Sequence, residues 1–400
     1  MIHGMQFVII RSLVLALVAV AQIYIFIQIR QVIKSSRRSN LFKSGAICLV
    51  GTTIGLLSAL NGYIIARPIH WIDPPLAAQI LFFDLPAIWI FGSIFSALFL
   101  FLIQLGSKLK KMIIRFYGAQ LSSQTALIPF NHSRRHFIQV AIGSITAAPL
   151  ILSGYGAAYA SNAYEIEELT LPFGHPLRVV HLSDIHAGIY MTPKAIRHYV
   201  ERVITLQPDV FVITGDFVTN SISFLPDCLK ELALVHARYG TFATLGNHEH
   251  WVGNLNEFQT IFKRYKIDLL QNEHQLIRTE SGTFAVAGID DLQSGHPNLP
   301  AALHGLDPAT PTLLLSHRPE IFPQAAAHGI PLTLAGHYHG GQIKLELPGL
   351  AISLAHLRTP YPEGLYRMNS SRLYVSRGIG TTFTPVRLNA PPEVTLLHLT

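Results

Sequence analysis

The apolar positions divide this chain into two halves of different character. In the first 160 residues, three stretches are almost continuously apolar. Each is about as long as the roughly 20 residues that cross a bilayer as a helix. The polar chain between them is too short to cover a soluble core, so they predict three membrane-spanning helices, over residues 7–29, 45–66 and 80–105.

A fourth apolar stretch, residues 137–160, is rich in small side chains and follows the pair Arg134-Arg135. Two interpretations of this pair are open: it resembles a twin-arginine export signal, or it is a basic anchor on the cytoplasmic side. Both make residues 1–160 a transmembrane anchor of about four helices. Cleavage after Ala160 would instead release the chain that follows.

Charge refines this picture. Residues 1–160 carry 13 Lys or Arg against two acids, whereas the other 240 residues carry 17 against 21. The basic residues lie in the loops between apolar stretches, which argues against a nucleic-acid partner and indicates that the loops after the first and third spans are cytoplasmic. Residues from about 161 onward are then expected outside the cell membrane, which makes the polar half extracytoplasmic.

From Leu177 onward, short β-branched runs alternate with amphipathic segments, a pattern typical of an α/β domain. We expect residues 161–176 to be a linker and residues 177–400 to form one domain. The predicted helices cover 193–206, 225–237, 255–265 and 319–328. The predicted strands cover 177–182, 210–214, 241–245, 283–287, 312–316, 332–335, 343–346, 364–367, 373–376 and 393–399.

Polar side chains follow five of these strands at the point where each strand ends. In open α/β sheets this edge is where ligands bind. Imidazole and carboxylate ligands without a thiolate favour zinc, manganese or iron, and one carboxylate can bridge two ions. The residues are Asp184 and His186, then Asp216, then Asn247 and His248, then His317, and finally His337 and His339.

These five blocks resemble the signature of the calcineurin-like metallophosphoesterases, and more narrowly their membrane-anchored bacterial branch. The likeness covers residues 177–400 and implies a four-layer α/β/β/α sandwich. It implies two divalent ions, one held by Asp184, His186, Asp216 and His339, the other by Asp216, Asn247, His317 and His337.

The resemblance also implies a role for His248, which would contact the phosphate or act as general acid. Its alternative role is to orient a neighbouring ligand. Arg318 and Arg377 could stabilise phosphate charge or could be ordinary solvated cations. The reaction implied is hydrolysis of a phosphomonoester, a phosphodiester or a pyrophosphate by a hydroxide shared between the ions, with Asp216 as the bridge.

An anchored site favours a substrate close to the bilayer, which could be lipid-linked. One alternative is a UDP-diacylglucosamine-type pyrophosphate hydrolase of lipid A synthesis, although that substrate is cytoplasmic. A second is a metal-binding membrane sensor without catalysis, against which the full ligand set argues. A third is a transporter, which the near absence of charge within the spans disfavours.

Overall fold

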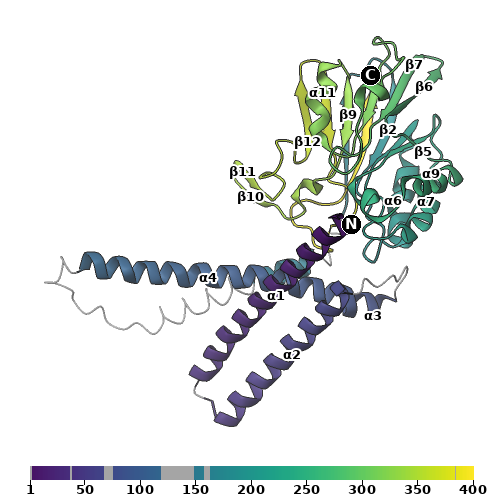
Figure 1. The fold of residues 1–400 in the computed structure, drawn as a ribbon. Coiled ribbons are helices and arrows are strands. Elements are labelled where there is room, and N and C mark those ends of the chain that lie inside the picture. Colours follow the sequence, from purple (N-terminus) through teal and green to yellow (C-terminus); the bar gives the residue numbers. More distant parts are fainter. Residues whose placement is uncertain (1, 37, 67–74, 119–147, 157–162, 383) are drawn as a thin grey trace. The chain divides into compact units, whose positions relative to one another are not determined.

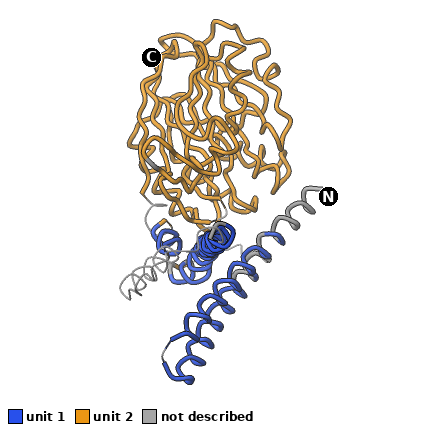
Figure 2. Tube along the Cα trace, turned by 90° about the vertical axis from the view of Figure 1, so that its left-hand side faces the viewer, with its two compact units in different colours: residues 1–69, 77–155 blue, residues 70–76, 156–400 orange. Residues whose placement is uncertain are grey.

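The computed structural model describes residues 2–36, 38–66, 75–118, 148–156, 163–382 and 384–400. The chain divides into two compact units (Figure 2). We call residues 1–69 with 77–155 the helical unit, and residues 70–76 with 156–400 the α/β unit.

The helical unit is built from long apolar helices: α1 (Ile2–Ser35), α2 (Asn40–Ala66) and α4 (Leu85–Gly118). The short helix α3 (Leu76–Gln79) continues into α4 through one π-helical turn, Ile80–Asp84. Among the described residues, three segments are long and apolar enough to cross a membrane. These are Leu15–Ser35, Asn40–Leu60 and Ile80–Phe116, which overlap the three stretches singled out in the sequence.

Polar side chains inside these helices pair with one another. The Ser58 hydroxyl donates a hydrogen bond to the Gln22 side-chain oxygen, and Gln104 Nε2 donates to Gln28 Oε1 at 2.7 Å. A polar group without a partner is costly in apolar surroundings. The glutamines that interrupt the apolar pattern therefore join the helices of this unit.

The fourth apolar stretch lies mostly outside the described residues. Of residues 137–160, the structure describes 148–156, which are helical. Arg134 and Arg135 also lie outside the described part. The fourth span and the export signal therefore stay predictions.

The α/β unit contains two six-stranded mixed sheets. The first has the order β1-β14-β2-β3-β4-β5, in which β2, β3 and β4 are parallel and β14 is antiparallel to β2. The second has the order β12-β13-β9-β8-β7-β6, in which β7, β8 and β9 are parallel.

The strands of the first sheet are β1 (Glu165–Leu171), β2 (Leu177–Leu182), β3 (Val210–Thr214), β4 (Thr241–Thr244), β5 (Asp268–Leu269) and β14 (Glu393–Leu399). Those of the second are β6 (Glu273–Thr279), β7 (Gly282–Gly288), β8 (Thr312–Leu315), β9 (Leu332–Ala335), β12 (Gly364–Met368) and β13 (Ser371–Val375). A separate hairpin pairs β10 (Leu345–Leu347) with β11 (Leu350–Ile352). The helices are α6 (Pro193–Thr205), α7 (Leu225–Leu232), α8 (Asn247–Val252), α9 (Leu255–Arg264), α10 (Leu299–Ala302) and α11 (Phe322–Ala327).

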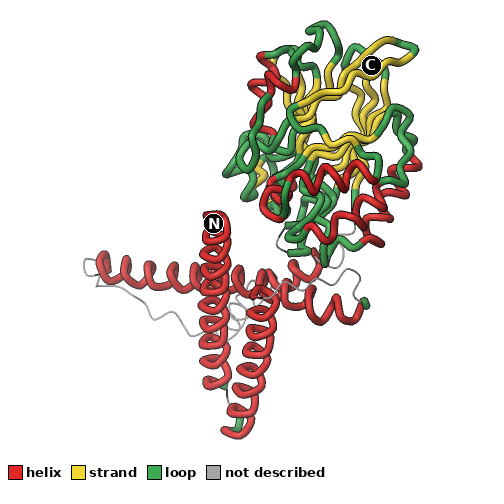
Figure 3. The backbone as a smooth tube through the Cα atoms, turned by 45° about the vertical axis from the view of Figure 1, so that its right-hand side comes forward, coloured by secondary structure: helices red, strands yellow, loops and turns green. Residues whose placement is uncertain are grey.

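Alternate residues of β2 face different layers, as the pleat of a strand requires. Val180 and Leu182 pack with the buried faces of α6, α7 and α9. Leu177 and Val179 instead pack against the second sheet. On the far face of that sheet, Leu314 packs with residues of α10 and α11. The layers run helix, sheet, sheet, helix, so the predicted four-layer α/β/β/α fold class is confirmed (Figures 1 and 3).

Several elements differ from the sequence prediction. The segment expected as a linker contains strand β1, whose polar run Glu165–Leu171 is held by parallel pairing with β14. Strands β5, β6 and β11 were not predicted, and β10 begins at Leu345 instead of Ile343. Residues 319–321 form a 3₁₀ turn before α11, because Pro323 has no N–H and fits only the first turn of an α-helix.

Candidate metal centre

The two sheets bring the polar strand ends together at one edge. Asp184 and His186 follow β2, Asp216 follows β3, and Asn247 begins α8 directly after β4. From the second sheet come His317 after β8 and the pair His337 and His339 after β9. Because β2, β3 and β4 are parallel, their carboxyl ends share one edge, as do those of β8 and β9.

Three buried residues form the first group that could hold a metal ion: Asp184, His186 and His339. His186 Nε2 lies 3.1 Å from His339 Nε2, and His339 Nε2 lies 3.4 Å from Asp184 Oδ1. Ligands of one small cation, each about 2.1 Å from it, are separated by distances of this order.

A second group consists of Asp216, His317 and His337. His317 Nε2 lies 3.3 Å from Asp216 Oδ2 and 3.1 Å from His337 Nδ1. The Asn247 side-chain oxygen lies 3.2 Å from the same His317 nitrogen. All seven residues expected as ligands therefore lie in one cluster.

Asp216 connects the two groups. Its Oδ2 atom lies 3.6 Å from His186 Nε2 as well as 3.3 Å from His317 Nε2, and the carboxylate is buried. Its other oxygen, Oδ1, accepts a hydrogen bond from the backbone N–H of His248 at 2.9 Å. The position suits a ligand shared by two ions.

Burial and neighbouring charges shift the pKa values of the cluster residues in both directions. Burial by itself would raise the pKa of Asp216, but His317 and His248 hold it well below its usual value. Burial by itself would lower the pKa of His317, and the facing Asp216 carboxylate raises it to about 10. Burial lowers the pKa of His186 to about 3, so this ring is a neutral ligand at ordinary pH.

The buried imidazole nitrogens of the cluster are placed as ligands of divalent cations would be. His317 Nδ1 donates to the Thr214 carbonyl at 2.8 Å, so Nε2 is the nitrogen that faces the cluster, and it would bind a cation in place of its proton. Metal-binding histidines are commonly held in this way by their second nitrogen. Two imidazole Nε2 atoms 3.1 Å apart, those of His186 and His339, also fit two ligands of one cation.

His248 also lies at the cluster, where with His186 and Asp216 it forms a third buried group that could hold a metal ion. Its Nδ1 donates to the Thr219 carbonyl, which leaves Nε2 facing the site 3.9 Å from Asp216 Oδ2. The ring centroid lies 4.6 Å from that of Trp251, whose side chain is half exposed. Trp251 was not singled out from the sequence, where a lone aromatic on a polar helix gives no signal.

Glu249 was also missed as a functional residue, although it directly follows His248 in the sequence. Its buried carboxylate accepts backbone hydrogen bonds from Gly246 at 2.8 Å, Asp216 at 2.9 Å and Phe217 at 2.8 Å. Burial, together with the charge of Asp216, raises the pKa of Glu249 to about 7. Glu249 fixes the turns that follow β3 and β4.

The two arginines named in the sequence have different surroundings. Arg318 is buried rather than solvated: its Nε donates to Asp291 Oδ1 at 2.9 Å and its Nη2 to Asn247 Oδ1 at 3.2 Å. It therefore places a cation at the cluster. Arg377 forms ion pairs with three carboxylates, those of Glu165, Glu167 and Glu393.

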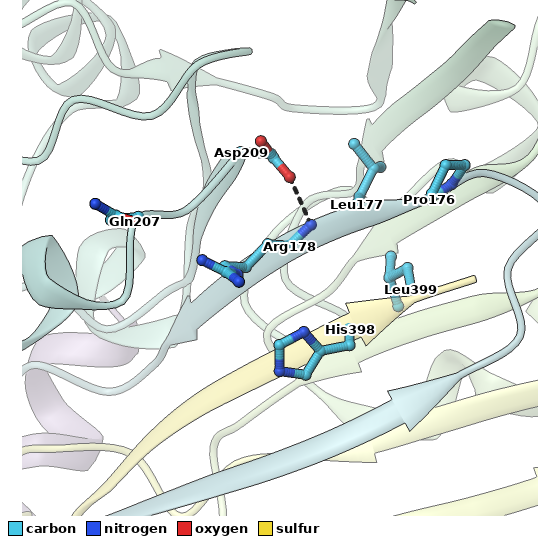
Figure 4. Close-up of a pocket in the computed structure, with 7 residues that line it drawn as sticks. All are labelled: Pro176, Leu177, Arg178, Gln207, Asp209, His398 and Leu399. Carbon is cyan, nitrogen blue, oxygen red and sulfur yellow. Dashed lines mark hydrogen bonds between the residues drawn. The ribbon is translucent and has the colours of Figure 1, made fainter. Parts of the chain in front are cut away.

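A shallow hollow at the opposite edge of the first sheet differs from this cluster (Figure 4). It lies at the start of β2 and the end of β14, where Arg178 N donates to Asp209 Oδ2 at 2.8 Å. Among the described residues, the His and Asp groups that could hold a metal lie at the other end of β2.

The sequence relationships agree with this geometry. A family model described as calcineurin-like phosphoesterase matches residues 177–341. A metallophosphoesterase of Helicobacter pylori (strain ATCC 700392 / 26695) is 30% identical over 302 residues, which are 72% of this chain and 77% of the relative. The chain belongs to the calcineurin-like metallophosphoesterase family, whose members are metal-dependent phosphoesterases.

Two further relatives extend this result. A transmembrane protein with a metallophosphoesterase domain from Bos taurus is 34% identical over 57% of this chain and 54% of its own length. Phosphodiesterase YaeI of Escherichia coli (strain K12) is 29% identical over 67% of this chain and 99% of its own. The crystal structure of TT1561 of Thermus thermophilus aligns with a TM-score of 0.36 and 13% identity, over 51% of this chain and 91% of that one.

Proposed function

We propose that this metallophosphoesterase is a membrane-anchored phosphodiesterase with two divalent ions, of Mn, Zn or Fe, in the described cluster. The observation that carries the proposal is the buried Asp216 carboxylate, which lies within 3.6 Å of a histidine from each group. Asp184, His186, Asp216 and His339 would hold one ion, and Asp216, Asn247, His317 and His337 the other.

Two such ions, when bound, lower the pKa of a coordinated water and neutralise charge on the phosphoryl oxygens. The chain itself supplies the geometry and the proton. Because the Thr219 carbonyl holds His248 Nδ1–H, a protonated His248 presents Nε2–H to the site. It would donate this proton to the oxygen of the departing group. The half-exposed Trp251 beside it offers that group an aromatic contact.

The proposed anchor comprises residues 1–160 with about four spans, and the basic loops place the catalytic domain outside the cell membrane. Strand β1, which begins at Glu165, pairs with β14 of this domain, so we extend the domain upstream of the predicted start at Leu177. A phosphodiester substrate is favoured by the name of the relative YaeI, and attachment to a bilayer favours a lipid-linked one. The buried ligand set argues against a sensor without catalysis.

Hydrolysis of bis-p-nitrophenyl phosphate by the purified full chain with Mn²⁺ tests this function. We expect His248→Ala to keep its metal and to lose turnover by about 100-fold or more, the usual contribution of a general acid. We expect Asp216→Asn to lose both metal and activity.

Metal content by mass spectrometry separates the two variants, and His304→Ala, on the exposed surface, is the matched control. Full activity in Asp216→Asn would refute the bridging role, and full activity in His248→Ala would refute its role as acid. Absence of activity in the wild-type chain with Mn²⁺, Zn²⁺ and Fe²⁺ would argue for the sensor.

A further inference from the structure

The chain between the last histidine pair and β12 forms an exposed apolar lobe. We use the name apolar lobe for residues 345–357, which contain the β10–β11 hairpin and the turn after it (Figure 1). Leu354 and Leu357 expose 75% and 77% of their surface. Leu345, Leu350 and Ile352 are exposed as well.

This concentration is unusual within the α/β unit. Its other exposed large apolar side chains in the described residues are scattered, with Ile204, Leu234, Trp251 and Leu276 on separate elements. Single exposed apolar side chains need no explanation, but a contiguous group marks a surface that binds something. The lobe therefore calls for an apolar partner.

The base of the lobe packs on the turn that carries His339. Gly341 follows His339 by two residues, and a Cβ atom there would overlap the Ser353 side chain. Where the lobe begins, Lys344 Nζ pairs with Glu346 at 2.9 Å and with Glu363 at 2.6 Å. The lobe is thus a rim of the site with its apolar side chains turned outward.

The chain also joins the α/β unit at this edge. Strand β1 is parallel to β14, and β14 is antiparallel to β2, so Glu165 at the start of β1 lies at the edge where β2 leads to Asp184. Arg377 contacts both the start of β1 and the turn that follows His339. Its Nη2 lies 2.9 Å from Glu165 Oε2, and its side chain lies against Gly340.

The length of the connecting segment limits how far this edge can lie from a membrane. The nine residues from 156 to 165 extend over at most about 30 Å. If residues 137–160 span the bilayer, the edge that carries both the metal centre and the lobe is held close to the lipid surface. Arg358, exposed at the end of the lobe, suits anionic headgroups there.

We propose that the apolar lobe inserts its leucine side chains into the lipid bilayer beside the metal centre. The proposal rests on the anchored phosphoesterase argued above and deepens it. With the lobe in lipid, the site opens at the membrane surface. A phosphoester with an acyl or polyprenyl group could then reach the metals without leaving the bilayer.

Lipid quenching of a reporter on the lobe tests the insertion. The full chain carries Cys48→Ser and either Leu354→Cys or Leu276→Cys, labelled with the fluorophore NBD in nanodiscs of phosphatidylcholine and phosphatidylglycerol. The remaining thiol, Cys228, is buried, and burial raises its pKa, so it does not label. Leu276 is the matched control, because it is 50% exposed on β6, the strand farthest from β12 in the second sheet.

We expect the label at position 354 to emit at shorter wavelength and to lose most of its emission when doxyl-labelled lipid is added, with no change at position 276. Equal quenching at both positions would overturn the proposal. A blue shift without quenching would also overturn it, since the lobe would then be covered by protein, either a second copy or helices of this chain.

A second labelling position and an activity assay complete the experiment. Leu357→Cys is a second reporter if Leu354→Cys fails to fold. Hydrolysis of bis-p-nitrophenyl phosphate by each labelled protein shows that its site is intact. An inactive wild-type chain would count against the proposed function, whereas the quenching result depends only on the position of the lobe.

Discussion

Five of the seven proposed ligands have a backbone conformation that most side chains avoid. Asp184, His186, Asp216, His337 and His339 have φ between 51° and 75°. Each such residue costs of order 1–3 kcal/mol, and this cost persists only where the surroundings hold it. These residues lie in the turns after the strands, and their backbone conformation directs the side chains into the cluster. The strained backbone therefore positions the proposed metal ligands.

Arg318 provides a prediction at the scale of single residues. We expect Arg318→Met with Asp291→Asn to lower kcat/KM for an anionic phosphodiester by about 100-fold, because a buried cation next to the cluster stabilises developing negative charge. Asp291→Asn is included because an unpaired buried carboxylate would destabilise the fold.

Metal content should be retained in this pair of substitutions. Arg238→Met with Glu280→Gln, an exposed ion pair, is the matched control. An unchanged kcat/KM would show that Arg318 takes no part in binding the substrate.

His181 predicts how stability depends on pH. It is buried on β2 with Nε2 2.8 Å from Thr214 Oγ1, and burial lowers its pKa to about 3 from 6.5. As the pH falls, His181 therefore takes up a proton in the unfolded chain at a higher pH than in the folded protein. The contribution of neutral His181 to stability is complete above pH 6.5 and is lost as the pH falls toward 3. The loss is about 1.4 kcal/mol for each pH unit.

The substitution His181→Gln removes this proton-binding site. We expect the thermal unfolding temperature of the variant to fall less than that of the wild type between pH 7 and pH 5. Parallel curves for the two proteins would contradict the assignment, and His304→Gln on the surface is the control.

At the scale of elements, the site depends on how strand ends are joined. Glycine is required where two turns touch: a Cβ atom at Gly246 would overlap the Asp216 carboxylate, and one at Gly336 would overlap the Ser183 hydroxyl. Glu249 then binds the backbone N–H groups of both turns. The ends of β3 and β4 therefore behave as one rigid unit that carries Asp216 and Asn247.

This coupling predicts that Glu249→Gln is more damaging than its similar shape suggests. The new amide group directs N–H toward backbone N–H groups, and leaving them without an acceptor costs about 1–3 kcal/mol. We expect a lower unfolding temperature together with weaker Mn²⁺ binding in titration calorimetry. Glu257→Gln, exposed on α9, should change neither, and a normal Mn²⁺ affinity in Glu249→Gln would argue against the coupling.

At the scale of the whole molecule, the sequence combines apolar helices with a separate catalytic domain. The three candidate spans contain few charges, and the side-chain oxygens of Gln22 and Gln28 accept hydrogen bonds from neighbouring helices. The metal cluster lies entirely within the α/β unit. In the proposed function, the helical unit would determine where phosphoester hydrolysis occurs, whereas the residues for the chemistry belong to the α/β unit.

The orientation of the protein can be measured directly. In a Cys48→Ser background, His304→Cys places a thiol on the exposed surface of the α/β unit. Because basic loops stay cytoplasmic, we expect a membrane-impermeant maleimide to label this thiol in intact spheroplasts. Labelling only after permeabilisation would place the domain in the cytoplasm and would revive the UDP-diacylglucosamine-type alternative.

Much of the candidate site could be read from sequence because its side chains stand directly after strands. Asp184 and His186 follow a short run of buried, mostly apolar residues, and the same pattern recurs before His317 and His337. Strand β1 was not predicted because its glutamates interrupt the apolar pattern of a strand. Its parallel pairing with β14 stabilises it. Arg318 could not be assigned, because its burial and its pairing with Asp291 depend on residues distant in the chain.

The sequence alone determined the apolar helices, the α/β character of the second half and the set of polar residues at strand ends, since each depends on local periodicity and side-chain chemistry. The four-layer fold class was implied by the family resemblance that those residues carry. The tertiary structure decided that these residues lie in one buried cluster, that Asp216 lies between two groups of it, and that an apolar lobe borders the site. These features arise when two sheets pack face to face, and distances between strands far apart in the chain are fixed only by that packing.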